Sequence, residues 1–294
     1  MTPKQEAPKS AWRSPWALGA FLAALLLMAA AVSVGSGFMP FSPSETLTVI
    51  WGKLSGGLIG LDETRITVMW EVRLPRLLTA MVCGAALGLS GAVFQGLLLN
   101  PLADPYTLGV SSGAACGAAV VIIMRLMAPG LPFLDAPWAL TAGAFIMASL
   151  TLALVIALAR DEMKRLSPVN LILAGVVMSA ILSAAISFMK YLAGEQVSSI
   201  IFWLLGSFQA RTWSDAAIVA AFFLPALLAA IWSAADMNIM TLGLRSAETL
   251  GVDTRRVRLR LLAAASLAAS AAVSVAGIIG FVGLIVPHLV RLAA

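Results

Sequence analysis

The chain has 294 residues, of which 61% are hydrophobic and 11% charged, with a formal net charge of +5 and a mean hydropathy of +0.97. This composition excludes a water-soluble globular protein and indicates a chain with many membrane-spanning segments. The positive charge does not require a nucleic-acid partner, because anionic lipid on the cytoplasmic face of a membrane accounts for it.

Apolar runs of about 20 residues, the length that crosses a bilayer, recur along the chain. Residues 197–208 are apolar but too short to cross, so they predict a partial or interfacial helix. No stretch has the composition of a soluble domain, and we expect residues 1–294 to form a single transmembrane domain. The predicted spans are residues 16–37, 77–99, 107–127, 138–159, 169–192, 213–234 and 259–279, with a shorter eighth run at 281–293.

The first apolar run follows Lys4, Lys9 and Arg13 and has the outline of a secretory signal peptide. It is longer than a cleavable signal, and residues 33–41 offer a poor cleavage site, which favours an uncleaved anchor. With residues 1–15 as a cytoplasmic tail, most of the 19 basic residues fall on the cytoplasmic side. The positive-inside tendency therefore supports a cytoplasmic amino terminus.

The spans contain almost no ionisable side chains near their centres, where Gln95 is polar but neutral. A proton-coupled transporter needs such groups, so their scarcity argues against one. The chain also lacks the Gly-x-x-x-x-Gly-Lys-Ser/Thr loop that binds nucleotide phosphates. Active transport would therefore require a separate subunit that supplies the energy.

Small residues recur four positions apart, as in Gly84 with Gly88, and Gly109 with Gly113 and Gly117. In a membrane such spacing lets helix backbones approach closely and gain dispersion contacts. We therefore expect these glycines to lie at helix–helix contacts.

Five further residues have special chemistry. Pro225 and Pro287 are expected to kink or end their helices. Cys83 and Cys116 lie in apolar runs without Cys-x-x-Cys spacing, so we expect them to act as small hydrophobic residues. His288 is the only histidine and has no nearby Asp or Cys ligands, so neither a metal site nor a cofactor is expected.

A polar reversal, Asn100-Pro101-Leu102-Ala103-Asp104-Pro105, separates the second and third runs. Its prolines cannot donate backbone hydrogen bonds, and the Asn100 and Asp104 side chains can accept them from nearby backbone amides. The segment is expected to end one membrane helix and begin the next.

The most informative internal loop joins the sixth and seventh runs, and residues 235–258 are expected in the cytoplasm. Within it residues 244–250 predict a short helix that Gly251 is suited to cap. The pattern alone leaves open whether this helix lies in the lipid interface. One side of the helix would carry Leu244, Ala247 and Leu250, and the other Arg245, Glu248 and Thr249.

From about residue 70 to the end, the chain closely resembles the FecCD-type permease subunits of ABC importers for iron(III) siderophores, haem and vitamin B12. The resemblance rests on several motifs that occur in the family's order. They are the segment from Arg73-Leu-Pro-Arg76 to Ala114, Trp203-Leu-Leu-Gly206-Ser207, Leu242-Gly243-Leu-Arg-Ser-Ala247-Glu-Thr-Leu250-Gly251, and Gly277-Ile-Ile-Gly-Phe-Val-Gly-Leu-Ile-Val-Pro287-His-Leu-Val-Arg291.

The resemblance implies an all-α polytopic membrane protein with the roughly ten-helix fold of the vitamin B12 permease. Members of that family continue past the Pro-His-x-x-Arg segment through a cytoplasmic turn and two more membrane helices, whereas this sequence stops at Ala294. We therefore expect about eight membrane helices and a carboxyl end that is short relative to the family.

The function that the resemblance implies is import by alternating access across a bacterial inner membrane. The implied partners are an ABC ATPase subunit, a periplasmic or lipid-anchored substrate-binding protein, and a second permease copy or a related permease. An iron(III)-siderophore-type chelate is the favoured cargo, with haem, cobalamin or molybdate as alternatives. A secondary transporter or channel that works without ATP, and a membrane scaffold that transports nothing, are the alternatives of a different class.

The resemblance also assigns roles to residues, none of them catalytic. In relatives, arginines that match Arg73 and Arg76 receive acidic residues of the binding protein, and guanidinium groups suit such carboxylates. Interfacial snorkelling or contact with lipid phosphate is the alternative for both. A segment that inserts into a cleft on the ATPase matches Leu242, Gly243, Arg245, Ala247, Glu248, Leu250 and Gly251, and the reversal contributes Asn100, Pro101, Asp104 and Pro105 as a structural loop motif.

Overall fold

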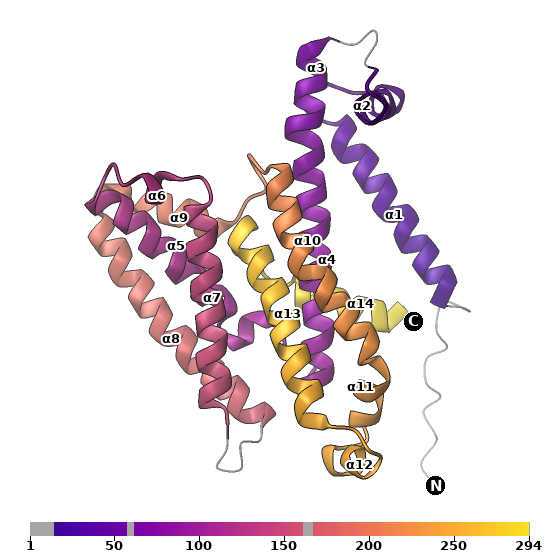
Figure 1. Ribbon diagram of the computed structural model, residues 1–294, viewed down its shortest axis with the longest axis vertical. Coiled ribbons are helices and arrows are strands. Elements are labelled where there is room, and N and C mark those ends of the chain that lie inside the picture. Colours follow the sequence, from indigo (N-terminus) through magenta and orange to yellow (C-terminus); the bar gives the residue numbers. More distant parts are fainter. Residues whose placement is uncertain (1–14, 58–61, 161–166, 294) are drawn as a thin grey trace.

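The computed structural model describes residues 15–57, 62–160 and 167–293, which are helical and contain no strand (Figure 1). Predictions for the tail up to residue 14 and for the basic residues at 164 and 165 lie outside the described residues. Seven helical stretches in this part of the chain are long and apolar enough to cross a membrane. Their main helices are α1 (Pro15–Gly35), α4 (Leu74–Leu98), α5 (Val110–Met127), α7 (Ala139–Leu158), α8 (Pro168–Ala193), α10 (Trp213–Trp232) and α13 (Thr254–Ala276).

Shorter elements connect or extend these helices. In Figure 1, α2 and α3 lie at one end of the long axis, and α12 lies at the other. The shorter elements are α2 (Pro43–Ser55), α3 (Glu63–Thr67), the π-helical η1 (Val68–Arg73), the 3-10 turns η2 (Pro105–Leu108) and η3 (Gly194–Gln196), α6 (Pro132–Asp135), α9 (Val197–Leu205), α11 (Ala234–Met240), α12 (Leu244–Thr249) and α14 (Val282–Ala293).

The predicted apolar runs lie on helices, but two of these helices begin earlier than predicted. The second helix begins at Glu63 instead of residue 77, because α3, η1 and α4 are continuous. Charged residues in its first turns lower the hydropathy without breaking the helix. Helix α13 begins at Thr254 instead of residue 259, where the Asp253 carboxylate accepts a hydrogen bond from the Arg256 amide and caps it.

Two other predictions about helices have clear outcomes. Residues 197–205 form the short helix α9, as predicted. Neither proline ends its helix, because α10 continues past Pro225 and α14 continues past Pro287.

Helix α13 lies at the centre of the bundle and packs against α4, α5, α7 and α10 (Figure 1). Its buried face consists largely of alanine and serine, including Ala268 and Ala272, which are almost fully buried. Lipid tails are as apolar as these side chains, so close packing and dispersion hold the helices together more than burial from water does. Small side chains on α13 permit this close approach.

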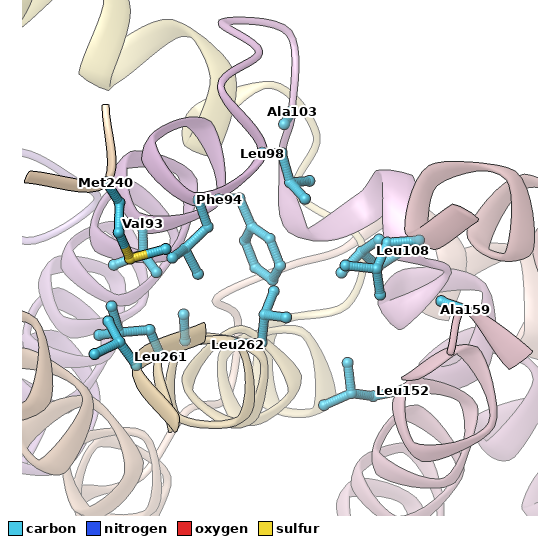
Figure 2. Packing of buried hydrophobic residues seen from close by; sticks show 14 of the residues in the cluster. Val93, Phe94, Leu98, Ala103, Leu108, Leu152, Ala159, Met240, Leu261 and Leu262 are labelled. Carbon is cyan, nitrogen blue, oxygen red and sulfur yellow. The ribbon is translucent and has the colours of Figure 1, made fainter. Parts of the chain in front are cut away.

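Larger side chains fill the bundle toward the α12 end. Phe94 on α4 and Leu262 on α13 point toward one another, with Leu108 on η2 close by (Figure 2). Met240 at the end of α11 belongs to the same buried cluster. The cluster joins the membrane helices to the loop that carries α12.

The glycine stripe on α5 packs as predicted. A Cβ atom on Gly113 would lie 2.5 Å from Thr151 Oγ1, and one on Gly117 would lie 2.2 Å from the carbonyl oxygen of Gly143. No side chain fits at such distances, so α5 and α7 are in backbone contact.

The prediction for the glycines on α4 is confirmed for Gly88, which faces α14, and wrong for Gly84. No heavy atom of the described residues lies within 4 Å of a Cβ built on Gly84, and one on Gly88 would meet only Val286 Cγ1, at 3.6 Å. The close approach on this helix occurs at Gly91, where a Cβ would lie 1.7 Å from the carbonyl oxygen of Gly283 on α14. Gly91 lies on the same face of α4 as Gly84 and Gly88, so the spacing indicated the right face, and the closest approach occurs one turn beyond it.

Candidate functional site

The reversal at residues 100–105 folds as predicted. Asn100 Oδ1 accepts a hydrogen bond of 3.0 Å from the Leu102 amide, and Asp104 Oδ1 accepts one of 2.9 Å from the Thr107 amide. Asp104 thereby caps η2, which begins at Pro105, and α5 follows at residue 110. Pro101 lies in the turn between the two capping residues.

Two motifs that are far apart in the sequence meet after α13. The Ser207 amide donates a 2.7 Å hydrogen bond to the Ala276 carbonyl, and Gly277 has a φ of +76°. A Cβ on Gly277 would lie 2.6 Å from the Gly206 Cα, so only glycine allows this backbone contact. Tyr106, beside the reversal, donates to the Ile279 carbonyl. The segment between α13 and α14 is therefore held from two sides.

Gln95 performs a task that the sequence did not reveal. Pro287 has no N–H, so it cannot donate the helical hydrogen bond to the carbonyl of Gly283. The Gln95 amide nitrogen instead donates to the carbonyls of Gly283, at 3.5 Å, and Leu284, at 3.3 Å. Arg291 donates to the amide oxygen of Gln95, which is only 5% exposed. This network fixes α14 on α4.

The α12 loop is rigidly built. The Val252 amide donates to the Ala247 carbonyl and the Gly251 amide to the Glu248 carbonyl, which together form a Schellman motif. Gly251, with a φ of +88°, occupies the left-handed position that this motif requires. The predicted cap is therefore confirmed. Gly243, just before α12, also has a positive φ, of +103°.

The side chains of α12 differ from the predicted pattern at one position. Ala247 is fully buried, and Leu244 packs against the same cluster, as predicted. Leu250 does not join them, because the helix ends at Thr249 and the following turn directs residue 250 outward. Leu250 is 62% exposed and Leu242 is 67% exposed, so two apolar side chains project from this end of the molecule.

Polar side chains complete the surface of α12. Arg245 and Glu248 are exposed, as predicted. Glu248 Oε1 also accepts a 2.9 Å hydrogen bond from the Thr254 hydroxyl at the start of α13. This hydrogen bond joins α12 directly to the start of the central helix.

The two arginines of the Arg-Leu-Pro-Arg motif have different environments. They lie inside the continuous helix from Glu63 to Leu98, just before residue 77, where the apolar run was predicted to begin. Arg73 donates hydrogen bonds of 2.5 Å to the carbonyls of Val34 and Met39, and its guanidinium group lies over the Phe41 ring. Arg73, at the end of η1, thus ties α1 and the segment between α1 and α2 to the long helix, whereas Arg76 is exposed.

Both cysteines are buried and free, and each packs in an apolar cluster, as predicted for small hydrophobic residues. His288 is exposed on α14. Within residues 15–57, 62–160 and 167–293, no three His, Cys, Asp or Glu side chains group in a way that could hold a metal ion.

Comparison with known proteins gives consistent results. The profile of the FecCD transport family matches residues 24–294. The "Uncharacterized ABC transporter permease protein YvrB" of Bacillus subtilis is 40% identical over 273 residues, which are 92% of this chain and 75% of that protein. The "Hemin transport system permease protein HmuU" of Yersinia pestis is 38% identical over 76% of this chain and 67% of its own length. Other relatives are named for the import of cobalamin, molybdate and Fe(3+)-citrate.

A solved structure described as "An inward-facing conformation of a putative metal-chelate type ABC transporter" has the same architecture. The TM-score is 0.76 at 30% sequence identity, and the match covers 94% of this chain and 80% of that one. The predicted fold, an all-helical membrane permease like that of the vitamin B12 importer, is thereby confirmed.

Proposed function

Because this chain belongs to the FecCD transport family of ABC importer permeases, we propose that it moves an iron(III)-siderophore-type metal chelate across the inner membrane by alternating access. ATP hydrolysis takes place on a separate subunit, and the chain itself is not an enzyme. The amino terminus lies in the cytoplasm, and a second permease copy or a related permease completes the pathway.

The observation that carries the coupling proposal is the construction of the α12 loop. Leu242 and Leu250 project as exposed apolar side chains from a loop that a Schellman motif locks. Leucines that project from a rigid loop suit a hydrophobic cleft on a partner, because little backbone freedom is lost on binding. We assign that cleft to the ATPase subunit, and Arg245 and Glu248 to the polar rim of the contact.

Replacing Gly251 with valine is expected to uncouple ATP hydrolysis from transport while membrane insertion is preserved. A β-branched residue at a φ of +88° costs about 1–2 kcal/mol and disrupts the Schellman motif. A cost of this size lowers the ratio of the native to the altered loop conformation by about fivefold or more. Transport per ATP hydrolysed should fall accordingly. Gly243→Val should act in the same direction. The measurement is transport and ATP hydrolysis in proteoliposomes that contain the ATPase and binding protein.

Gly56→Val is the matched control for these variants. Gly56 has a φ of +78° and, like Gly243 and Gly251, no heavy atom of the described residues within 4 Å of a built Cβ. It therefore bears the same backbone strain, but at the end of the molecule opposite α12 (Figure 1). Normal coupling in both α12 variants, or equal uncoupling in Gly56→Val, would contradict the role of this loop.

The proposed cargo is supported by what the relatives and the structural neighbour are described as transporting. The structural neighbour is described as metal-chelate type, and relatives are named for hemin, cobalamin and Fe(3+)-citrate. One relative is named for molybdate, which is a small oxyanion. The test is ATP-driven uptake of an iron(III) siderophore, hemin, cobalamin and molybdate by the reconstituted importer. Uptake of molybdate alone would exclude a chelate, and equal uptake without ATP would exclude the importer mechanism.

We also propose that Arg76, with Arg73, receives acidic residues of the substrate-binding protein. Arg76→Glu is expected to lower the affinity for the binding protein by about tenfold or more, because a charge-assisted contact becomes repulsive. Basal ATPase activity should remain close to normal. Affinity in nanodiscs at low and high salt gives the measurement, and wild-type affinity should fall as salt rises.

The double variant Arg73→Glu with Arg76→Glu should abolish uptake. Arg73→Glu is also expected to loosen α1 and α2, because the carbonyls of Val34 and Met39 lose their donor. Arg76→Glu therefore isolates docking from folding, and Lys53→Glu on α2 controls for the loss of a basic residue near the same end. If Arg76→Glu binds the protein as tightly as the wild type, the arginines serve only as membrane anchors and helix ties.

The orientation can be tested with single cysteines, because both native cysteines are buried. A membrane-impermeant maleimide should label Ser55→Cys on α2 in intact cells, and Ser246→Cys on α12 only after permeabilisation. Labelling on the reverse sides would place the amino terminus outside.

Light scattering of the purified importer would count its permease copies, and a single permease chain per complex would refute the paired pathway.

A further inference from the structure

A groove of about 630 Å³ lies between α7 and α10, toward the ends where these helices begin. Both helices pack on α13, and Ser274 of α13 lines the groove. Phe145 of α7 and Phe222 of α10 also line it, with ring centroids 4.7 Å apart. The groove is remote from α12 and is not used by the coupling proposed above.

The lining changes from polar to apolar along the helix axis. Arg211, Thr212 and Asp215 stand where α10 begins, and Trp138 stands where α7 begins. Phe222 lies nine residues after the first residue of α10, which is about 13 Å further into the membrane. A polar mouth above an aromatic interior matches an amphiphile that lies parallel to the membrane normal, with tryptophan at headgroup level.

The mouth carries one charge of each sign, and both have unused hydrogen-bonding capacity. Arg211 donates through Nε to the Gln209 carbonyl at 3.2 Å, and its two Nη groups have no hydrogen-bond partner among the described residues. Asp215 accepts from the Thr212 amide and hydroxyl through Oδ2, each at 2.8 Å. Its Oδ1 accepts no hydrogen bond from the described part of the chain. The pair therefore offers a donor fork and an acceptor to one ligand.

We propose that this groove binds a phospholipid with a zwitterionic headgroup of the phosphatidylethanolamine type. The Arg211 guanidinium group contacts the phosphate, the Asp215 carboxylate contacts the ammonium group, and an acyl chain lies along Phe145 and Phe222. A zwitterionic headgroup is favoured because the mouth carries one positive and one negative side chain. An anionic lipid would instead be repelled by the Asp215 carboxylate.

Native mass spectrometry of the whole chain in detergent tests the proposal, with phosphatidylethanolamine, phosphatidylcholine and phosphatidylglycerol added separately. Phosphatidylethanolamine should be retained best, because the choline ammonium group cannot donate a hydrogen bond to Asp215. Arg211→Gln should lower its retention about tenfold, the effect of one lost charge-assisted hydrogen bond. Asp215→Asn should lower retention of phosphatidylethanolamine and raise that of phosphatidylglycerol.

Two further variants make the result decisive. Lys190→Gln, on α8 and outside the groove, should leave retention unchanged. Ile218→Trp should fill the groove and lower retention of all three lipids, with the fold checked by circular dichroism. The proposal is overturned if Arg211→Gln retains phosphatidylethanolamine as well as the wild type does, if phosphatidylglycerol is preferred, or if Ile218→Trp changes nothing. The last outcome would leave the groove to a protein partner.

Discussion

Gly91→Ala is expected to destabilise the protein by about 3 kcal/mol, although alanine favours helices. The added Cβ would lie 1.7 Å from the Gly283 carbonyl oxygen and 2.4 Å from its carbonyl carbon. Both are backbone atoms, so no rotamer change relieves the overlap and α14 must move away from α4. Thermal unfolding followed by tryptophan fluorescence in detergent gives the measurement.

Gly84→Ala on the same helix is the matched control. A Cβ there meets no heavy atom of the described residues within 4 Å, so the variant should unfold within about 0.5 kcal/mol of the wild type. The two variants carry the same chemical change on one helix and differ only in what faces it. Equal stability of both would show that α4 and α14 do not touch at Gly91.

Gln95→Leu is expected to cost about 2–3 kcal/mol, because it leaves the Gly283 carbonyl without a donor in an apolar environment. The same change removes the acceptor of Arg291. Transport should fall together with stability, because α14 loses its tie to α4. Unfolding temperature and uptake by the reconstituted importer are the two measurements.

A double-mutant cycle with Pro287→Ala isolates the mechanism. Alanine at this position restores the N–H that donates to Gly283 within α14, so Gln95→Leu should cost about 1 kcal/mol less in that background. Strict additivity of the two changes would refute the view that Gln95 substitutes for the missing amide. Arg291 is present in all four proteins of the cycle, and the loss of its acceptor at Gln95 cancels between the two backgrounds.

The membrane helices could be predicted from the sequence because hydropathy is a local property. A run of about 20 apolar residues has few alternatives to a spanning helix in lipid. The start of the second long helix, at Glu63 in α3, was missed for the same reason, since charged residues in α3 and η1 interrupt the hydropathy while their side chains reach carbonyls and aromatic rings elsewhere. Arg65, for example, donates to the Pro40 carbonyl and to Glu45.

Local chemistry likewise predicted the turns. Asn100 and Asp104 cap the reversal, and Gly251 caps α12, because each acts on backbone within a few residues of itself. Leu250 was assigned to the wrong side because helical periodicity was extended one residue beyond the end of the helix. The cap itself was predictable, but the direction of the side chain after it was not.

The sequence by itself determined the class of the protein, its spans, its turns and the family to which it belongs. Only the tertiary structure decided which small residues touch most closely, since glycine spacing favoured Gly84 and Gly88 whereas the backbone contact is at Gly91. Likewise, only the fold shows that Gln95 serves a proline distant in the chain. The physical reason is that hydropathy and capping act over a few neighbouring residues, whereas the point along a helix at which another helix crosses it is set by partners brought close in space.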